Sequence, residues 1–142
     1  TRKESSAASD VYKRQVYCQA EAGWWDDHVA PHFTDRAQAQ ALMQALGLPA
    51  EKLDGLVHEL STGERQRLGL VRALAQAPRV LLLDEPTAAL DQAATGLVEA
   101  ALQRYLDGGA AILMVTHSPE QAQRLARRRW RMEAGRLEPL WT

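Results

Sequence analysis

A run of apolar residues that ends in two adjacent acids constrains this chain more than any other feature. The stretch RVLLLDEPTAALD, residues 79–91, places the apolar residues 80–83 directly before Asp84 and Glu85, and a proline follows. Because the run lacks the alternation of a half-buried strand, we expect a strand that is buried on both faces of a parallel sheet. Ligands bind at the carboxyl ends of such strands, so the two carboxylates suit a metal-phosphate site.

Length and composition are those of one globular domain with a modest core. The chain has 142 residues, of which 46% are hydrophobic and 25% are charged. Its single cysteine, Cys18, excludes an internal disulfide and a cysteine-rich metal cluster. The longest apolar run, residues 110–115, has the length of a strand rather than the ~20 residues of a membrane span. Any membrane role therefore needs a partner.

The first fifteen residues need separate treatment. SSAASDVYKRQ, residues 5–15, resembles the translation of a transposon-type sequencing adapter. We interpret residues 1–15 as a library-preparation scar, expect them to be disordered and leave them out of the fold. The alternative is a natural polar tail. With the scar interpretation, the natural sequence starts near Val16 and its true N-terminus is missing.

The charge balance gives no support to nucleic-acid binding. The whole chain has 17 basic and 18 acidic residues. The first fifteen residues hold four of the basic and two of the acidic ones, which leaves 13 basic and 16 acidic residues and a net charge of −3. An acidic chain has no general attraction to a phosphate backbone. We interpret the arginine run at 127–129 as a solvated helix face.

Hydrophobic periodicity predicts helices that alternate with continuous apolar strands. We expect buried strands at 80–83 and 110–117, and a terminal strand and turn at 130–140. Alternation of this kind indicates an α/β fold with a mostly parallel sheet. The expected helices follow the capping residues Asp35, Ser61, Asp91 and Ser118.

A second motif precedes the acidic strand. In LSTGERQRLGLVRAL, residues 60–74, Ser61 and Gly63 begin a helix. A hydroxyl, free backbone N–H groups and the positive end of the helix would then face an anion. The alternative is an ordinary serine N-cap with a glycine in the first turn of the helix.

Together these stretches resemble the ATPase subunit of ATP-binding-cassette (ABC) transporters. Residues 60–74 are similar to the ABC signature motif, VLLLDE to the Walker B motif, TAALD to the D-loop and MVTHSPE to the switch-histidine segment. Their order and spacing are those of the family, with 23 residues from Ser61 to Asp84 and 33 from Asp84 to His117. Thr62 departs from the glycine that is commonest in the family's signature.

The resemblance implies a P-loop NTPase-like fold with a helical subdomain, and it implies ATP and Mg²⁺ as ligands. Asp84 would hold Mg²⁺, Glu85 would activate the attacking water as general base, and His117 would contact the γ-phosphate. An apolar strand that ends in two acids is more often an ordinary strand end. A lone histidine at a strand end is usually structural.

The resemblance also implies nucleotide-binding residues outside the acidic strand. Ser61, Gly63 and Glu64 belong to the signature motif, which completes the ATP site of the opposite subunit in this family. Glu64 stands where glutamine is commoner. Asp91 in the D-loop would lie at the dimer interface, or would only cap the helix that follows.

A glutamine that touches Mg²⁺ and senses the membrane partner is expected near the start of the natural sequence. VYCQAEAGWW, residues 16–25, resembles that Q-loop region, and the register leaves Gln19 or Ala20 at the glutamine position. Trp24 and Trp25 follow directly. They would either receive the membrane subunit, because exposed aromatic residues often anchor interfaces, or cover the helical subdomain.

The phosphate-binding loop G-x-x-x-x-G-K-[ST] does not occur in this sequence. The resemblance therefore covers residues 16–78, as Q-loop, helical subdomain and signature helix, and residues 79–142, as the C-terminal part of the ATPase core. We expect a C-terminal piece of a longer subunit, truncated at its N-terminus and inactive in ATP hydrolysis by itself.

The family resemblance implies protein partners and a location. The partners would be a second nucleotide-binding subunit and a transmembrane permease, with the chain peripheral on the cytoplasmic face of the inner or plasma membrane. One alternative is a soluble ABC ATPase of repair or translation. The short separation of 42 residues between Gln19 and Ser61 disfavours the repair type, and the acidic net charge disfavours ribosome binding. The other is a non-enzymatic interaction protein that retains only the signature half.

Overall fold

A computed structural model describes residues 15–18 and 23–140 of the chain. The adapter interpretation therefore lies outside the described residues, except at Gln15. The Q-loop candidates Gln19 and Ala20 also lie outside them. Gln15 opens the first strand, one residue before the expected start of the natural sequence, and is opposite Val80.

A parallel sheet of three strands, in the order β1-β2-β3, forms the centre of the fold. The strands are β1 (Gln15–Cys18), β2 (Val80–Asp84) and β3 (Ala111–Val115). The central strand β2 pairs with both neighbours, so the carboxyl ends of all three strands lie at one edge of the sheet. This arrangement confirms the predicted α/β class with a parallel sheet.

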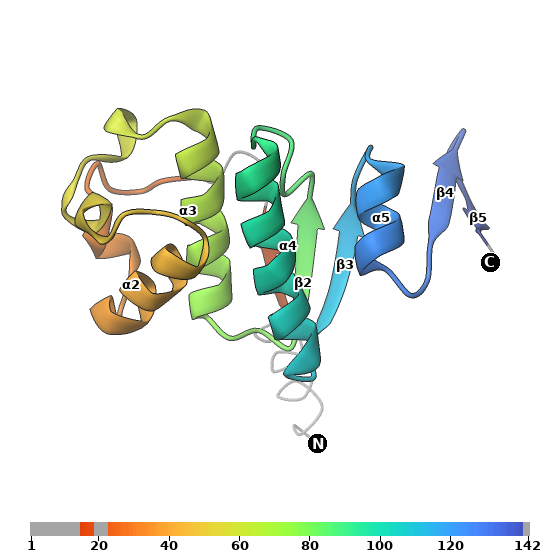
Figure 1. Ribbon diagram of the computed structural model, residues 1–142, viewed down its shortest axis with the longest axis horizontal. Helices are drawn as coiled ribbons and strands as arrows, with labels where there is room; N and C mark the ends of the chain where they lie inside the picture. The colour runs from red at the N-terminus through yellow and green to blue at the C-terminus, as the bar shows by residue number, and fades with distance from the viewer. Residues whose placement is uncertain (1–14, 19–22, 141–142) are drawn as a thin grey trace, which may run out of the picture.

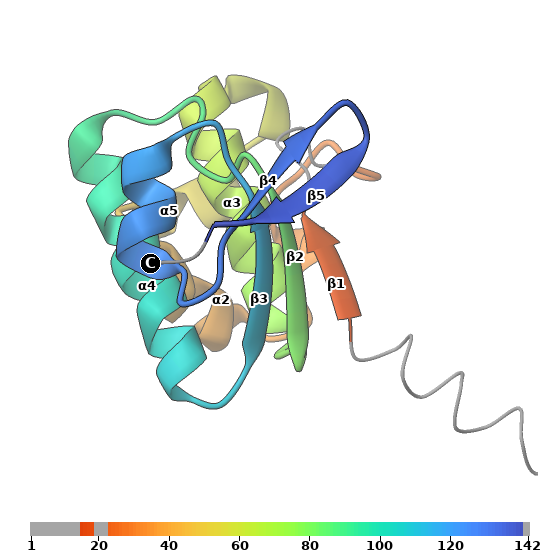
Figure 2. The same ribbon diagram turned by 90° about the vertical axis from the view of Figure 1, so that its right-hand side faces the viewer.

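Helices connect the strands and lie on one side of the sheet (Figure 2). The long helices are α3 (Thr62–Ala75), which precedes β2, and α4 (Gln92–Asp107), which joins β2 to β3. At one end of the molecule, α2 (Arg36–Ala45) and three short 3₁₀ helices form the helical subdomain beside α3 (Figure 1). The 3₁₀ helices are η1 (Ala30–His32), η2 (Ala50–Asp54) and η3 (Val57–Glu59).

The C-terminal part of the chain lies at the other end of the molecule (Figure 1). Helix α5 (Pro119–Leu125) follows β3, and an antiparallel hairpin of β4 (Trp130–Glu133) and β5 (Arg136–Pro139) follows α5. The sequence predicted one terminal strand and a turn, so the second strand is an addition. Among the described residues, none of the helices is long and apolar enough to cross a membrane.

Local capping chemistry starts the helices where the sequence predicted. The side chains of Asp35, Asp91 and Ser118 each accept a hydrogen bond from a backbone N–H in the first helical turn. Each such cap stabilises its helix by about 1 kcal/mol. The donor–acceptor distances are 3.0 Å from Gln38 N, 2.8 Å from Ala94 N and 3.2 Å from Gln121 N, respectively.

The expectation that both apolar strands are buried on both faces is wrong for the described part of the chain. Successive strand residues point to opposite faces of a sheet. On the helical face, Leu81 and Leu83 are 0% and 2% exposed. On the other face, Tyr17, Leu113 and Val115 are 54%, 59% and 56% exposed, because the described helices cover only one side.

This asymmetry predicts that two leucines on neighbouring strands differ sharply in their contribution to stability. We expect Leu81→Ala to lower the free energy of unfolding of the 142-residue chain by about 2–5 kcal/mol, since it leaves a cavity in the hydrophobic core. The matched control Leu113→Ala, on the exposed face, should change it by about 0.5 kcal/mol or less. Urea unfolding measures both values, and equal losses for the two variants would contradict this description of the core.

Candidate functional site

The site is built at the carboxyl end of β2. Asp84 is the last residue of the strand, and Glu85 turns out of it while its N–H still donates to the carbonyl oxygen of Val115 at 3.0 Å. Glu85 has φ = 47°, in the left-handed region that residues other than glycine rarely adopt. Backbone strain of this kind costs about 1–3 kcal/mol and concentrates at functional sites.

The structure brings the two predicted catalytic residues together. His117 lies just beyond the end of β3, and its Nε2 is 3.6 Å from Oε1 of Glu85. This distance allows an ion pair when the histidine is protonated, but it is too long for a hydrogen bond. The His117 side chain is 95% exposed. Oε1 of Glu85 is shielded from solvent and has no hydrogen-bond partner in the part of the chain that the structure describes.

Asp84 has a neighbour that the sequence did not indicate. The hydroxyl of Tyr17, on the adjacent strand β1, donates to Oδ2 of Asp84 at 3.3 Å. The two residues are 67 positions apart, so only the pairing of β1 with β2 brings them together. A carboxylate that accepts from a phenol keeps its second oxygen available to other ligands.

The carboxylates can bind magnesium together with phosphates and water, but they do not form a protein cage for the ion. No group of three or more His, Cys, Asp or Glu side chains that could hold a metal ion occurs within residues 15–18 and 23–140. Mg²⁺ at nucleotide sites is usually held by one or two carboxylates together with phosphates and water, rather than by a protein cage. Asp84 with Glu85 beside it supplies the donors for that mode, and Mg²⁺ would there neutralise charge on the phosphates.

Ser61 caps helix α3 through a reciprocal pair of hydrogen bonds. Its hydroxyl oxygen accepts from Glu64 N at 3.2 Å, and Oε2 of Glu64 accepts from Ser61 N at 2.8 Å. This capping box is the N-cap alternative raised by the sequence. The N–H groups of Thr62 and Gly63, at the first two helical positions, have no acceptor inside the helix. Binding of an anion at this helix end stays a prediction.

Glu64 is held in its ionised form by these contacts. The backbone N–H of Ser61 is the main cause that lowers the pKa of the Glu64 carboxyl, and the Ser61 hydroxyl and Lys52 add to it. Nζ of Lys52 is 3.4 Å from Oε1 of Glu64. The carboxylate thus links the short helix η2 to the start of the signature helix α3.

Gly63 is required by the D-loop of the same chain. A Cβ atom at this position would lie 3.0 Å from the carbonyl oxygen of Ala89 and 3.2 Å from Cδ2 of Leu90. The backbone contact cannot relax as a flexible side chain would. The start of α3 therefore packs directly against the D-loop. Asp91, which follows Leu90, caps α4 as expected, and its role in a dimer stays a prediction.

The two tryptophans occupy different environments. Trp24 is partly buried, with the Arg72 guanidinium 4.6 Å from its ring centroid and the His32 ring 4.8 Å away, edge-on. Trp25 also contacts the His32 ring, with the ring centroids 4.6 Å apart, but it is 69% exposed. Trp24 thus fits the covering role, because Arg72 belongs to α3, whereas Trp25 retains the surface that a partner would need.

Sequence reasoning missed two further residues of the site, Gln66 and Gln121. Gln66 donates to the carbonyl oxygen of Glu85, and Gln121 donates to the hydroxyl of Thr87. A glutamine within a helix is typically a surface residue. No signal in the sequence marks these two as buried, because their partners lie 19 and 34 positions away.

The comparisons with known proteins give the family. The family model for the ABC transporter matches residues 2–88, which is more than half of the chain. The chain therefore belongs to the ABC transporter family. The match begins within the segment that we interpret as adapter sequence, and that interpretation stays a prediction.

Two curated relatives are ATP-binding subunits. The chain is 48% identical over 77 residues to the phosphate import ATP-binding protein PstB of Aeropyrum pernix, covering 54% of this chain and 30% of the relative. It is 43% identical over 105 residues to the lipoprotein-releasing system ATP-binding protein LolD of Bordetella pertussis, covering 73% of this chain and 45% of the relative. The chain thus spans less than half the length of either relative.

Solved structures confirm the predicted P-loop NTPase-like fold. The dimeric bacterial ABC transporter cassette MJ0796 superposes with a TM-score of 0.67 and 28% identity over 75% of this chain and 47% of that chain. CbiO1 of Clostridium perfringens, part of the transporter complex cbiONQ, gives a TM-score of 0.73 over 97% of this chain and 60% of that one. At 19% identity, the second likeness concerns the fold alone.

The capping box predicts a pH dependence of stability. The pKa of Glu64 is lower in the folded chain than in the unfolded one, so its contribution is complete above about pH 4.3 and is lost as the pH falls through the folded-state pKa. We expect Glu64→Gln to be destabilised at pH 7 and to lose less stability than the unsubstituted chain on acidification. Urea unfolding over this pH range measures the difference.

Glu138→Gln, on the exposed strand β5, is the control for this experiment. It should follow the unsubstituted chain at every pH. An unchanged pH dependence in Glu64→Gln would show that the negative charge of Glu64 adds nothing to stability.

Proposed function

We propose that this chain is the C-terminal part of the ATP-hydrolysing subunit of an ABC transporter. One observation carries the proposal: Glu85 and His117 approach to 3.6 Å beyond the carboxyl ends of two neighbouring parallel strands. In parallel α/β sheets this edge is where ligands bind. Membership of the ABC transporter family supports ATP as the ligand.

Each residue at this edge has a proposed role in hydrolysis. Asp84 holds Mg²⁺, Glu85 takes a proton from the attacking water, and His117 contacts the γ-phosphate. The left-handed turn at Glu85 supports this assignment, because it directs the carboxylate out of the sheet and towards His117. Catalysis of phosphoryl transfer depends mainly on such positioning and on charge stabilisation.

A second copy of the subunit completes the site in the proposed mechanism. Ser61, Gly63 and Glu64 of one subunit approach the ATP that the other subunit binds, and Asp91 lies at the interface between them. The first N–H groups of α3, which have no acceptor inside the helix, and the positive end of the helix suit a phosphate. A dimeric structure is known for the related cassette MJ0796.

A transmembrane permease is the proposed partner for coupling. Gln19 or Ala20 is the proposed Q-loop position. The exposed ring of Trp25, which follows them in the sequence, is a proposed contact for the permease. The subunit would then be peripheral, on the cytoplasmic face of the inner or plasma membrane. The named functions of the relatives in phosphate import and lipoprotein release support a transport role.

ATP hydrolysis by the longer protein that contains this chain tests the proposal. We expect Glu85→Gln to lower kcat by about 10²–10⁴-fold, because it removes the general base, while ATP binding is retained. A phosphate-release assay and nucleotide titration measure the two quantities. Glu59→Gln, an exposed residue of η3, is the matched control and should keep full activity. Hydrolysis that survives Glu85→Gln would contradict the assigned role.

The 142-residue chain alone should not hydrolyse ATP, because its sequence has no phosphate-binding loop. ATP turnover by the purified chain that Glu85→Gln abolishes would contradict this expectation. A longer protein that binds its partners without hydrolysing ATP would support the interaction-protein alternative instead.

A further inference from the structure

Two buried polar side chains hold the same short turn. Gln66 and Gln121 are the buried polar residues in the described part of the chain, at 6% and 1% exposure. Gln66 comes from the signature helix α3, and Gln121 comes from α5, which follows the switch histidine. Both contact the turn of residues 85–89, which starts at Glu85. Burial of an amide is costly unless hydrogen bonds satisfy it. Both polar groups of the Gln66 amide are bonded, whereas Gln121 is held through Nε2 alone, and its buried Oε1 has no hydrogen-bond partner among the described residues.

Gln66 joins the two ends of this turn. Its Nε2 donates to the carbonyl oxygen of Glu85 at 2.7 Å, and its Oε1 accepts from Ala89 N at 3.1 Å. The same Glu85 oxygen also accepts from Ala88 N at 3.2 Å within the turn. The NH₂ group and the carbonyl oxygen of the Gln66 side chain therefore both form hydrogen bonds with the backbone of one five-residue segment.

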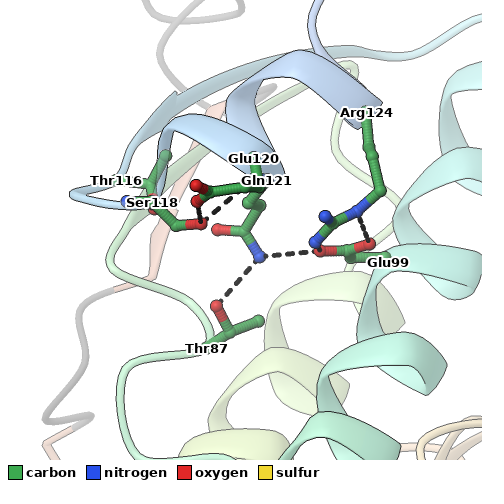
Figure 3. A network of polar contacts seen from close by, with 7 residues as sticks. All are labelled: Thr87, Glu99, Thr116, Ser118, Glu120, Gln121 and Arg124. Carbon is green, nitrogen blue, oxygen red and sulfur yellow. Dashed lines mark hydrogen bonds and ion pairs between the residues drawn. The ribbon is translucent and has the colours of Figure 1, made fainter.

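Gln121 contacts Thr87, in the middle of the turn (Figure 3). Its Nε2 donates to Oγ1 of Thr87 at 2.9 Å and to Oε1 of Glu99 at 3.2 Å. Glu99, on α4, is itself held by two hydrogen bonds from Arg124 on α5, at 2.7 and 2.9 Å. The first turn of α5 and the Glu85 turn are thus fixed to the same helix, α4.

The turn needs such support because of the backbone at Glu85. Its φ of 47° is unfavourable for a residue with a Cβ, and a released turn would relax towards negative φ. Relaxation would rotate the Glu85 carboxylate away from His117, which lies 3.6 Å from it. The two glutamines supply the hydrogen bonds that oppose this relaxation.

We propose that Gln66 and Gln121 are positioning residues that clamp the 85–89 turn and so fix the Glu85 carboxylate beside His117. This inference rests on the function proposed above for its catalytic consequence, but the clamp itself is a property of the chain alone. The clamp also ties the signature helix to the carboxylate of the same subunit. The close packing of Gly63 against Ala89 reinforces this connection.

Amide hydrogen exchange in the 142-residue chain, followed by NMR, tests the clamp without any nucleotide. In Gln66→Met we expect the amide of Ala89, and that of Glu85 bonded to Val115, to exchange at least tenfold faster. The matched control is Gln76→Met at the end of the same helix, where the exposed Gln76 amide donates to Arg72 O of that helix. It should leave both rates unchanged.

A second variant keeps the test decisive where Gln66→Met does not fold. Gln66→Glu retains the acceptor for Ala89 N but loses the donor to the Glu85 carbonyl. We expect Ala89 to keep its protection while the Glu85 amide exchanges at least tenfold faster. Unchanged exchange at both amides in a folded Gln66 variant would overturn the proposal.

Activity of the longer protein separates positioning from a general structural role. Gln66→Met and Gln121→Met should each lower kcat for ATP hydrolysis at least tenfold with KM for ATP within twofold, because the clamp touches Glu85 and not the nucleotide. Unchanged kcat in both variants would overturn the positioning role. If the longer protein hydrolyses no ATP, the proposed function fails, and the exchange rates alone still decide whether the clamp exists.

Discussion

The parallel pairing of β2 with its two neighbours is the interaction on which the rest of the structure depends. It places Tyr17 beside Asp84 from one side and the end of β3 beside Glu85 from the other. The hydrogen bond from Glu85 N to Val115 O continues this pairing by one residue past the strand. Without this register, Glu85 and His117, which are 32 positions apart in the sequence, would not lie close together.

The second constraint is the packing of the signature helix against the turn that follows β2. Gly63 has no Cβ, which leaves room for the D-loop backbone. Gln66 forms hydrogen bonds with both ends of the Glu85 turn. In the proposed dimer, one end of α3 faces the ATP of the opposite subunit while its side holds the carboxylate of its own. A movement of α3 would therefore affect both the ATP site of the opposite subunit and the carboxylate of its own subunit.

Local patterns in the sequence were sufficient to predict the long helices and the strands of the parallel sheet, but not the second strand, β5, of the terminal hairpin. The caps at Asp35, Asp91 and Ser118 and the apolar strand before Asp84 predicted the helices, the sheet type and the edge where Glu85 and His117 meet. Burial depends on which faces are covered, so the exposed side of the sheet was not predictable from apolar runs. The buried glutamines and Tyr17 depend on long-range contacts, which no local pattern encodes.

We propose that these residues are one part of an ATP-binding subunit whose phosphate-binding loop is encoded further upstream. Sequencing the source DNA upstream of the Val16 codon, outward from a primer within the codons for residues 84–91, tests it most directly. We expect an in-frame G-x-x-x-x-G-K-[ST] motif before Val16. A natural start codon near Val16 with no such motif before it would contradict the account and leave the carboxylates as remnants or as an interaction surface.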